Sequence, residues 1–351
     1  MHICFRALLA TGTVFYSCAA YALDKPLLLE DCAAIAGDRE RLACFDTLAA
    51  SKMPGREETP TQAGLLPAPP TTAPSAPTAV AKVAPPEKEA SFLADHWELE
   101  PEYTRRLFHF RPHRENYLIA SYNPDPNNAP YRPFRSLTGT QGLAEAELHF
   151  QIGFKLKFAE DVAGKPIDLW FGYTQQSFWQ ASNRQASSPF RETNYQPEVM
   201  AVLPLHFELL GVRARFINLG FVHESNGQSS TLSRSWNRLY LQTGIERGKF
   251  TMLARVWKRL NEDREEDDNP DILDYMGHGD LLGTYRNNGH EYSVLARYNF
   301  HTDKGAVQLG WAFPIASKLK GYVQFFSGYG QSLIDYNYSQ RTIGLGVLVT
   351  Y

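Results

Sequence analysis

The side chains best suited to chemistry in this 351-residue chain are His223 and Ser225, which stand two positions apart. A serine hydroxyl becomes nucleophilic when a histidine accepts its proton, and the histidine needs a polar group that fixes its tautomer. A hairpin centred near residue 230 would make Asn237 the cross-strand neighbour of His223. The three residues therefore predict a site in which Ser225 attacks, His223 acts as the base and Asn237 orients His223.

These three polar residues share their face with apolar ones. On the segment before His223, the residues at alternate positions are Ile217, Leu219 and Phe221, so they share a strand face with His223 and Ser225. Asn237 likewise has the parity of Leu239 and Leu241. A polar group directed into lipid lacks water, whereas one at a strand end in the headgroup zone stays wet. Each residue alone would fit the second explanation, but their convergence favours a catalytic site that faces lipid.

The elements that position these residues follow a period of two from about residue 115 to the C-terminus. In residues 148–158, six apolar side chains share one face, and His149, Gln151, Lys155 and Lys157 share the other. Eleven alternating residues match a tilted membrane strand, since globular strands average only about five or six. The sequence also ends on an alternating segment closed by the aromatic Tyr351, typical of outer-membrane barrels.

Twelve such segments predict an all-β fold, a 12-stranded antiparallel transmembrane β-barrel in the outer membrane. We expect strands near 116–124, 143–158, 167–180, 197–210, 212–225, 235–247, 249–260, 273–287, 290–303, 305–317, 320–333 and 338–351.

Composition and charge exclude two other classes of protein. The mean hydropathy of −0.36 is too polar for a bundle of transmembrane helices but suits strands with one polar face. The formal net charge is −3, and Lys and Arg are scattered singly, so we expect no nucleic-acid partner.

Three segments precede the barrel domain, which we place at residues 91–351. Residues 1–22 predict a signal peptide, although Cys18 leaves a lipoprotein signal as an alternative. Residues 23–53 have helical spacing, and Cys32 and Cys44 predict a disulfide in an oxidising compartment. This segment is either a module for a periplasmic partner or a spacer. Residues 54–90 are rich in Pro, Ala and Thr and predict a linker.

Six longer stretches carry a more specific signal. They are 173–176 (YTQQ), 187–195 (SSPFRETNY), 223–227 (HESNG), 233–240 (SRSWNRLY), 326–330 (FSGYG) and 333–337 (LIDYN). In this order they resemble the outer-membrane phospholipase A family over about residues 93–351. The resemblance does not cover the cysteine-containing segment or the linker.

The resemblance implies a calcium-dependent hydrolase of phospholipid and lysophospholipid acyl esters, with phospholipase A1 and A2 activity, that is active as a homodimer. It implies that the Gly227 amide helps to form the oxyanion hole. It further implies one Ca²⁺ per active site, shared across the dimer and held by the Ser233 hydroxyl, the Gln228 carbonyl and the Ser187 carbonyl of the second subunit. Gln175, outward by parity, would pair across the dimer.

Two points qualify the calcium assignment. Many family members carry Arg at position 228, but a carbonyl ligand makes Gln228 an acceptable replacement. The acidic residues 262–268 are interpreted as a solvated loop and are left out of the calcium site.

Two alternatives to the hydrolase remain open. A pore or envelope-anchoring barrel would need neither Ser225 nor calcium. A catalytically quiet relative would keep only binding, but the intact Ser-His-Asn set argues against it.

Overall fold

The chain divides into two compact units, residues 1–82 and 83–351. The computed structural model describes residues 32–52, 90–134, 142–263, 265 and 267–350. The predicted signal peptide and, apart from residue 90, the predicted linker lie outside the described residues, as does Tyr351.

The first unit contains helix α2 (Asp38–Lys52), preceded by a helical turn at residues 32–33. Acidic side chains in the first turn of α2 interact favourably with the helix dipole and favour a helix start there. A disulfide joins Cys32 to Cys44, so the predicted disulfide-linked helical segment is present in the described part of this unit.

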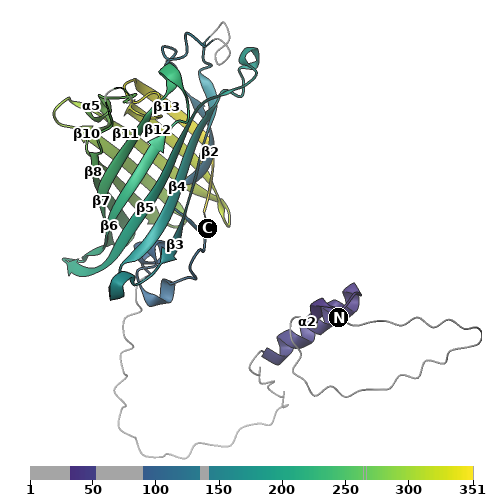
Figure 1. The fold of residues 1–351 in the computed structure, drawn as a ribbon. Helices are drawn as coiled ribbons and strands as arrows, with labels where there is room; N and C mark the ends of the chain where they lie inside the picture. The colour runs from purple at the N-terminus through teal and green to yellow at the C-terminus, as the bar shows by residue number, and fades with distance from the viewer. Residues whose placement is uncertain (1–31, 53–89, 135–141, 264, 266, 351) are drawn as a thin grey trace, which may run out of the picture. The chain divides into compact units, whose positions relative to one another are not determined.

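The second unit is a closed barrel of twelve antiparallel strands, seen side-on in Figure 1. The strands are β2 (Asn116–Tyr122), β3 (Ala146–Ala159), β4 (Asp168–Trp179), β5 (Phe190–Leu209), β6 (Val212–Ser225), β7 (Ser235–Arg247), β8 (Phe250–Arg259), β9 (Gly279–Asn287), β10 (His290–Asn299), β11 (Lys304–Ala316), β12 (Leu319–Tyr329) and β13 (Ser339–Val349). Strands adjacent in sequence pair, and β13 pairs with β2, which closes the ring and leaves no open edge. The predicted fold class is confirmed.

The barrel unit also contains several short elements. They are β1 (Arg111–Pro112), which pairs with β3, the helices α3 (Phe92–Trp97) and α5 (Ile272–Met276), and the 3-10 turns η1 (Pro101–Tyr103), η2 (Val162–Gly164), η3 (Arg184–Ala186) and η4 (Ser230–Leu232). Within the described parts of the chain, no helix combines the length and apolar character needed to cross a bilayer.

The barrel has apolar side chains outside and polar side chains inside. Ile152 on β3 is 52% exposed and Leu345 on β13 is 63% exposed, whereas His149 and Lys155, which point inward from β3, are at most 1% exposed. Hydrocarbon around the outer wall gives this inverted arrangement its stability. The faces predicted for residues 148–158 are confirmed.

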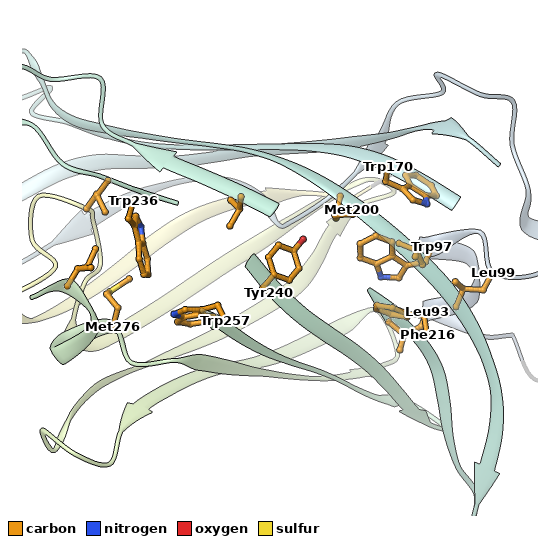
Figure 2. Packing of buried hydrophobic residues seen from close by; sticks show 14 of the residues in the cluster. Leu93, Trp97, Leu99, Trp170, Met200, Phe216, Trp236, Tyr240, Trp257 and Met276 are labelled. Carbon is orange, nitrogen blue, oxygen red and sulfur yellow. The ribbon is translucent and has the colours of Figure 1, made fainter. Parts of the chain in front are cut away.

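Aromatic side chains fill much of the interior. Figure 2 shows Trp97 of α3 beside Trp170 and Phe216, and a second group around Trp236 and Trp257 farther along the barrel. The Trp97 and Phe216 ring centroids are 5.0 Å apart, and those of Trp236 and Trp257 are 6.3 Å apart. The second group lies behind the β6–β7 hairpin and supports it from inside.

The start of the predicted strand 273–287 is wrong, because residues 272–276 form α5 and β9 begins only at Gly279. Pro270 precedes the helix, and Gly277, with φ +65°, ends it. Ile272 and Met276, four residues apart on one helix face, are buried in the interior cluster.

The start of the predicted strand 197–210 is also wrong, because β5 begins at Phe190. The register shifts where Trp179 pairs with Phe190 and Phe178 pairs with Glu192. This bulge interrupts the alternation of apolar and polar side chains. Polar residues then occupy both faces, so the sequence pattern does not indicate a strand there. The predicted strand 320–333 likewise extends too far, since Gly330 at φ +70° follows the end of β12.

Candidate active site

His223 and Asn237 lie opposite each other on β6 and β7, as predicted. The ladder pairs His223 with Asn237 and Ser225 with Ser235. His223 Nδ1 and Asn237 Oδ1 are 2.9 Å apart, within hydrogen-bond distance. Both side chains are half-buried and share the outward face with Phe221 and Leu239, which are 41% and 44% exposed.

Ser225 lies two positions beyond His223 on the same face and is also half-buried. Among the described residues, no hydrogen bond joins Ser225 Oγ to His223. Bonds of this kind often tighten only in the complex with substrate. The structure thus brings His223 and Asn237 into direct contact and places Ser225 next to them on the same strand.

Glu224, between the two residues, points into the barrel and anchors the strand. Its Oε2 accepts hydrogen bonds from Trp236 Nε1 at 2.9 Å and from Arg238 at 2.6 Å, and its Oε1 accepts one from Gln196 at 2.9 Å. This buried, charge-assisted network fixes the backbone that presents Ser225 to the outside.

The loop that follows Ser225 carries the residues that the sequence assigned to the oxyanion hole and to calcium. Gly227 has φ +63°, and a Cβ at this position would lie 3.3 Å from the Tyr195 ring, so glycine suits both the backbone and the space. The Ser233 hydroxyl donates a hydrogen bond to Asp268. The backbone N–H of Gln228 donates a hydrogen bond to Asn226 Oδ1 at 3.2 Å.

Ser187 lies in a different loop, directly after η3, with φ +58°. No hydrogen bond between Ser187 and either Gln228 or Ser233 is found in the described part of this chain. Nor do any three His, Cys, Asp or Glu side chains gather there as metal ligands. A cation at this loop would therefore depend mainly on hydroxyl and carbonyl oxygens.

Gln175 belongs to a row of polar groups on the outward face of β4. It accepts a hydrogen bond from the Tyr173 hydroxyl at 3.0 Å and donates one to Ser177 Oγ at 3.1 Å. The amide is thus satisfied within one chain, while its half-buried position leaves a polar patch on an otherwise apolar wall.

Two residues of the acidic segment contact the candidate site, although the sequence interpretation placed this segment in a solvated loop. Glu262 Oε1 accepts a hydrogen bond from Asn237 Nδ2 at 3.0 Å, and Asp268 accepts one from Ser233. The sequence does hold a signal for the contact of Glu262. The Leu260 amide donates a hydrogen bond to the Asn237 carbonyl at 2.8 Å, so pairing with β7 continues beyond the end of β8. Because side chains alternate between faces, Glu262, two positions after Leu260, also faces outward.

Comparison with known proteins gives a consistent result. The family model for phospholipase A1 matches residues 93–349. A candidate phospholipase A1 of Neisseria meningitidis serogroup B is 42% identical over 345 residues, covering 90% of this chain and 89% of that protein. Phospholipase A1 of Escherichia coli K12 is 36% identical over 242 residues, covering 69% and 82%.

A solved structure of the Salmonella typhi outer membrane phospholipase dimer with bound calcium superposes with a TM-score of 0.67. The identity is 33%, and the match covers 74% of this chain and 97% of that one. The barrel fold, the extent of the family match and these identities agree, so this chain is an outer-membrane barrel that belongs to the outer membrane phospholipase A family.

Proposed function

We propose that this chain hydrolyses the acyl esters of glycerophospholipids at both positions, and those of lysophospholipids, through Ser225, His223 and Asn237. The observation that supports this most strongly is the 2.9 Å contact between His223 and Asn237 on the lipid-facing wall, beside Ser225. A triad on this face meets its substrate without drawing lipid into water.

The reaction proceeds in two steps. Ser225 Oγ attacks the ester carbonyl carbon while its proton passes to His223 Nε2, and the resulting oxyanion accepts a hydrogen bond from the Gly227 amide. Collapse breaks the ester bond, and His223 returns the proton to the departing alcohol oxygen. Water then attacks the acyl-serine ester, His223 takes its proton, and Ser225 regains a proton as the fatty acid leaves.

The donors in the 228–233 loop suit calcium. Ca²⁺ binds oxygen ligands, and this loop offers the Ser233 hydroxyl and the Gln228 carbonyl, with the Asp268 carboxylate next to Ser233. These residues would hold the ion with the Ser187 carbonyl of the second subunit. When bound, calcium would supply positive charge near the developing oxyanion.

A homodimer suits this ligand set, because among the described residues no hydrogen bond links Ser187 to Ser233 and the two residues lie in different loops. The Salmonella relative is a dimer with bound calcium. The polar patch at Gln175 on the outer wall offers a second contact between two copies, since an amide pair across a lipid-embedded interface is favourable.

A pore is the function to test against the hydrolase. The interior cavity measures about 210 Å³ and is lined by polar side chains such as Glu198 and Arg238. Trp97, Trp170 and Phe216 also pack together inside the barrel, whereas porins enclose a wide aqueous channel. The filled interior favours the hydrolase.

The experiment uses phospholipid with distinguishable acyl chains at its two positions, dispersed in detergent with the full-length protein. We expect calcium-dependent release of both fatty acids, with little release in excess chelator. Release of one chain only would contradict the combined A1 and A2 activity, equal release in chelator would contradict the calcium requirement, and no release would favour the pore.

A further inference from the structure

We propose that Glu262 is a positioning residue that fixes the orientation of Asn237 and supplies the negative charge of the catalytic hydrogen-bond chain. This inference depends on the proposed role of Ser225, His223 and Asn237. In a Ser-His-Asp site the negative charge lies on the residue that touches histidine. Here that residue is neutral, and the charge lies one hydrogen bond farther out, on Glu262.

The contacts form a continuous chain from β6 through β7 to the segment that follows β8. Glu262 Oε1 accepts from Asn237 Nδ2 at 3.0 Å, and Asn237 Oδ1 lies 2.9 Å from His223 Nδ1. The Leu260 amide, bonded to the Asn237 carbonyl at 2.8 Å, holds the Glu262 segment against β7. The Glu262 side chain is only 17% exposed, so the contact is sheltered from water.

The chemistry of each group fixes the direction of every hydrogen bond. An ionised carboxylate only accepts hydrogen bonds, so the Asn237 amino group must face Glu262 and the Asn237 oxygen must face His223. His223 Nδ1 must then carry a proton, which leaves Nε2 free to accept the proton of Ser225.

Without Glu262, the two ends of the Asn237 amide become interchangeable. A flipped amide would present its amino group to His223 Nδ1 and favour the tautomer protonated at Nε2, which cannot act as the base. The carboxylate also strengthens the intermediate bond, because hydrogen bonds in series polarise one another.

Glu262 has a second partner, which provides the competing explanation. Its Oε2 lies 3.6 Å from Arg259, so Glu262 could serve only to neutralise that cation. Arg259, however, has a closer carboxylate partner in Asp267 at 2.6 Å and donates to the Asn269 carbonyl at 3.0 Å. Removal of Glu262 therefore leaves Arg259 paired, and we expect the variant to fold.

The test compares Glu262→Ala, Glu262→Gln, Asn237→Asp and the double variant Asn237→Asp/Glu262→Gln in the full-length protein. Glu265→Gln, an exposed neighbour in the same acidic segment, is the matched control. The measurements are kcat and KM for fatty-acid release at saturating calcium, with the thermal unfolding midpoint of each variant.

We expect Glu262→Ala to lower kcat about 10- to 100-fold with unchanged KM and unfolding midpoint, because a wrong tautomer costs up to about 10⁴-fold. Glu262→Gln keeps an acceptor for Asn237 and should lose less. Asn237→Asp places two carboxylates face to face and should lose activity. In the double variant the new amide donates to the new carboxylate, so kcat should recover at least about fivefold over Asn237→Asp, an effect that a purely structural role would not produce.

The inference would be overturned by a kcat for Glu262→Ala within twofold of wild type, or by a double variant no more active than Asn237→Asp. Neither result affects the proposed function, which is tested separately by calcium-dependent release of both fatty acids and by the requirement for Ser225. A loss in Glu265→Gln equal to that in Glu262→Ala would also count against the specific contact.

Discussion

Replacing Asn226 by alanine should disorder the loop that carries the proposed calcium ligands while leaving the barrel folded. Asn226 is 3% exposed and points inward directly after Ser225. Its amide donates to the Leu232 carbonyl at 2.8 Å and to Glu192 at 3.3 Å, and its oxygen accepts from the Gln228 amide at 3.2 Å and the Arg234 amide at 3.0 Å. One side chain thus ties both ends of the loop together.

The magnitude follows from these four hydrogen bonds. A hydrogen bond contributes a net of about 1 kcal/mol, and the exposed Gln228 end can exchange its partner for water. Removing the Asn226 side chain should therefore destabilise the ordered loop by about 2–3 kcal/mol. At about 1.4 kcal/mol per tenfold, this corresponds to roughly 30- to 140-fold in the calcium concentration for half-maximal activity.

The assay is fatty-acid release as a function of calcium concentration for wild type and Asn226→Ala. Asn218→Ala is the control, since Asn218 is equally buried on the same face of β6 but makes one long bond, 3.4 Å to Gln242. We expect the control to keep the wild-type calcium dependence. An unchanged calcium dependence in Asn226→Ala would refute the reasoning, as would an equal shift in both variants.

Three further results are expected. Glu224→Ala should lower the free energy of unfolding by about 3–5 kcal/mol, because Arg238 becomes an unpaired buried cation, and a change below 1 kcal/mol in urea unfolding would contradict this. Gly227→Val should reduce fatty-acid release about tenfold with little change in unfolding midpoint, because a non-glycine residue at φ +63° costs about 1–2 kcal/mol, and wild-type release would count against it. Cys32→Ser with Cys44→Ser should leave barrel unfolding and hydrolysis unchanged, since the disulfide lies in the other compact unit; a parallel loss of both would disprove that independence.

The catalytic hairpin could be predicted from the sequence because its alternation is regular. The predicted segments 212–225 and 235–247 coincide with β6 and β7, and the pairing of His223 with Asn237 follows from the hairpin centre. Apolar side chains at every second position fix both the face and the register, since a slip of one residue would reverse all of them.

Other features could not be predicted because they depend on contacts that alternation does not encode. The contact of Glu262 with Asn237 requires pairing to continue past the end of β8, and the acidic composition of the segment masks it. The start of β5 lies beyond a bulge, and α5 has apolar residues that a strand would also show. In each case tertiary packing, not local pattern, determines the outcome.

The most direct test of the proposed mechanism is the initial rate of fatty-acid release by Ser225→Ala, compared with wild type at saturating calcium. Ser225 is half-buried on the outer wall, so the substitution should leave the unfolding midpoint unchanged. If Ser225 is the nucleophile, the rate should fall by at least about 10³-fold, as expected when an acyl-enzyme can no longer form. A rate within tenfold of wild type from an equally stable barrel would contradict this mechanism.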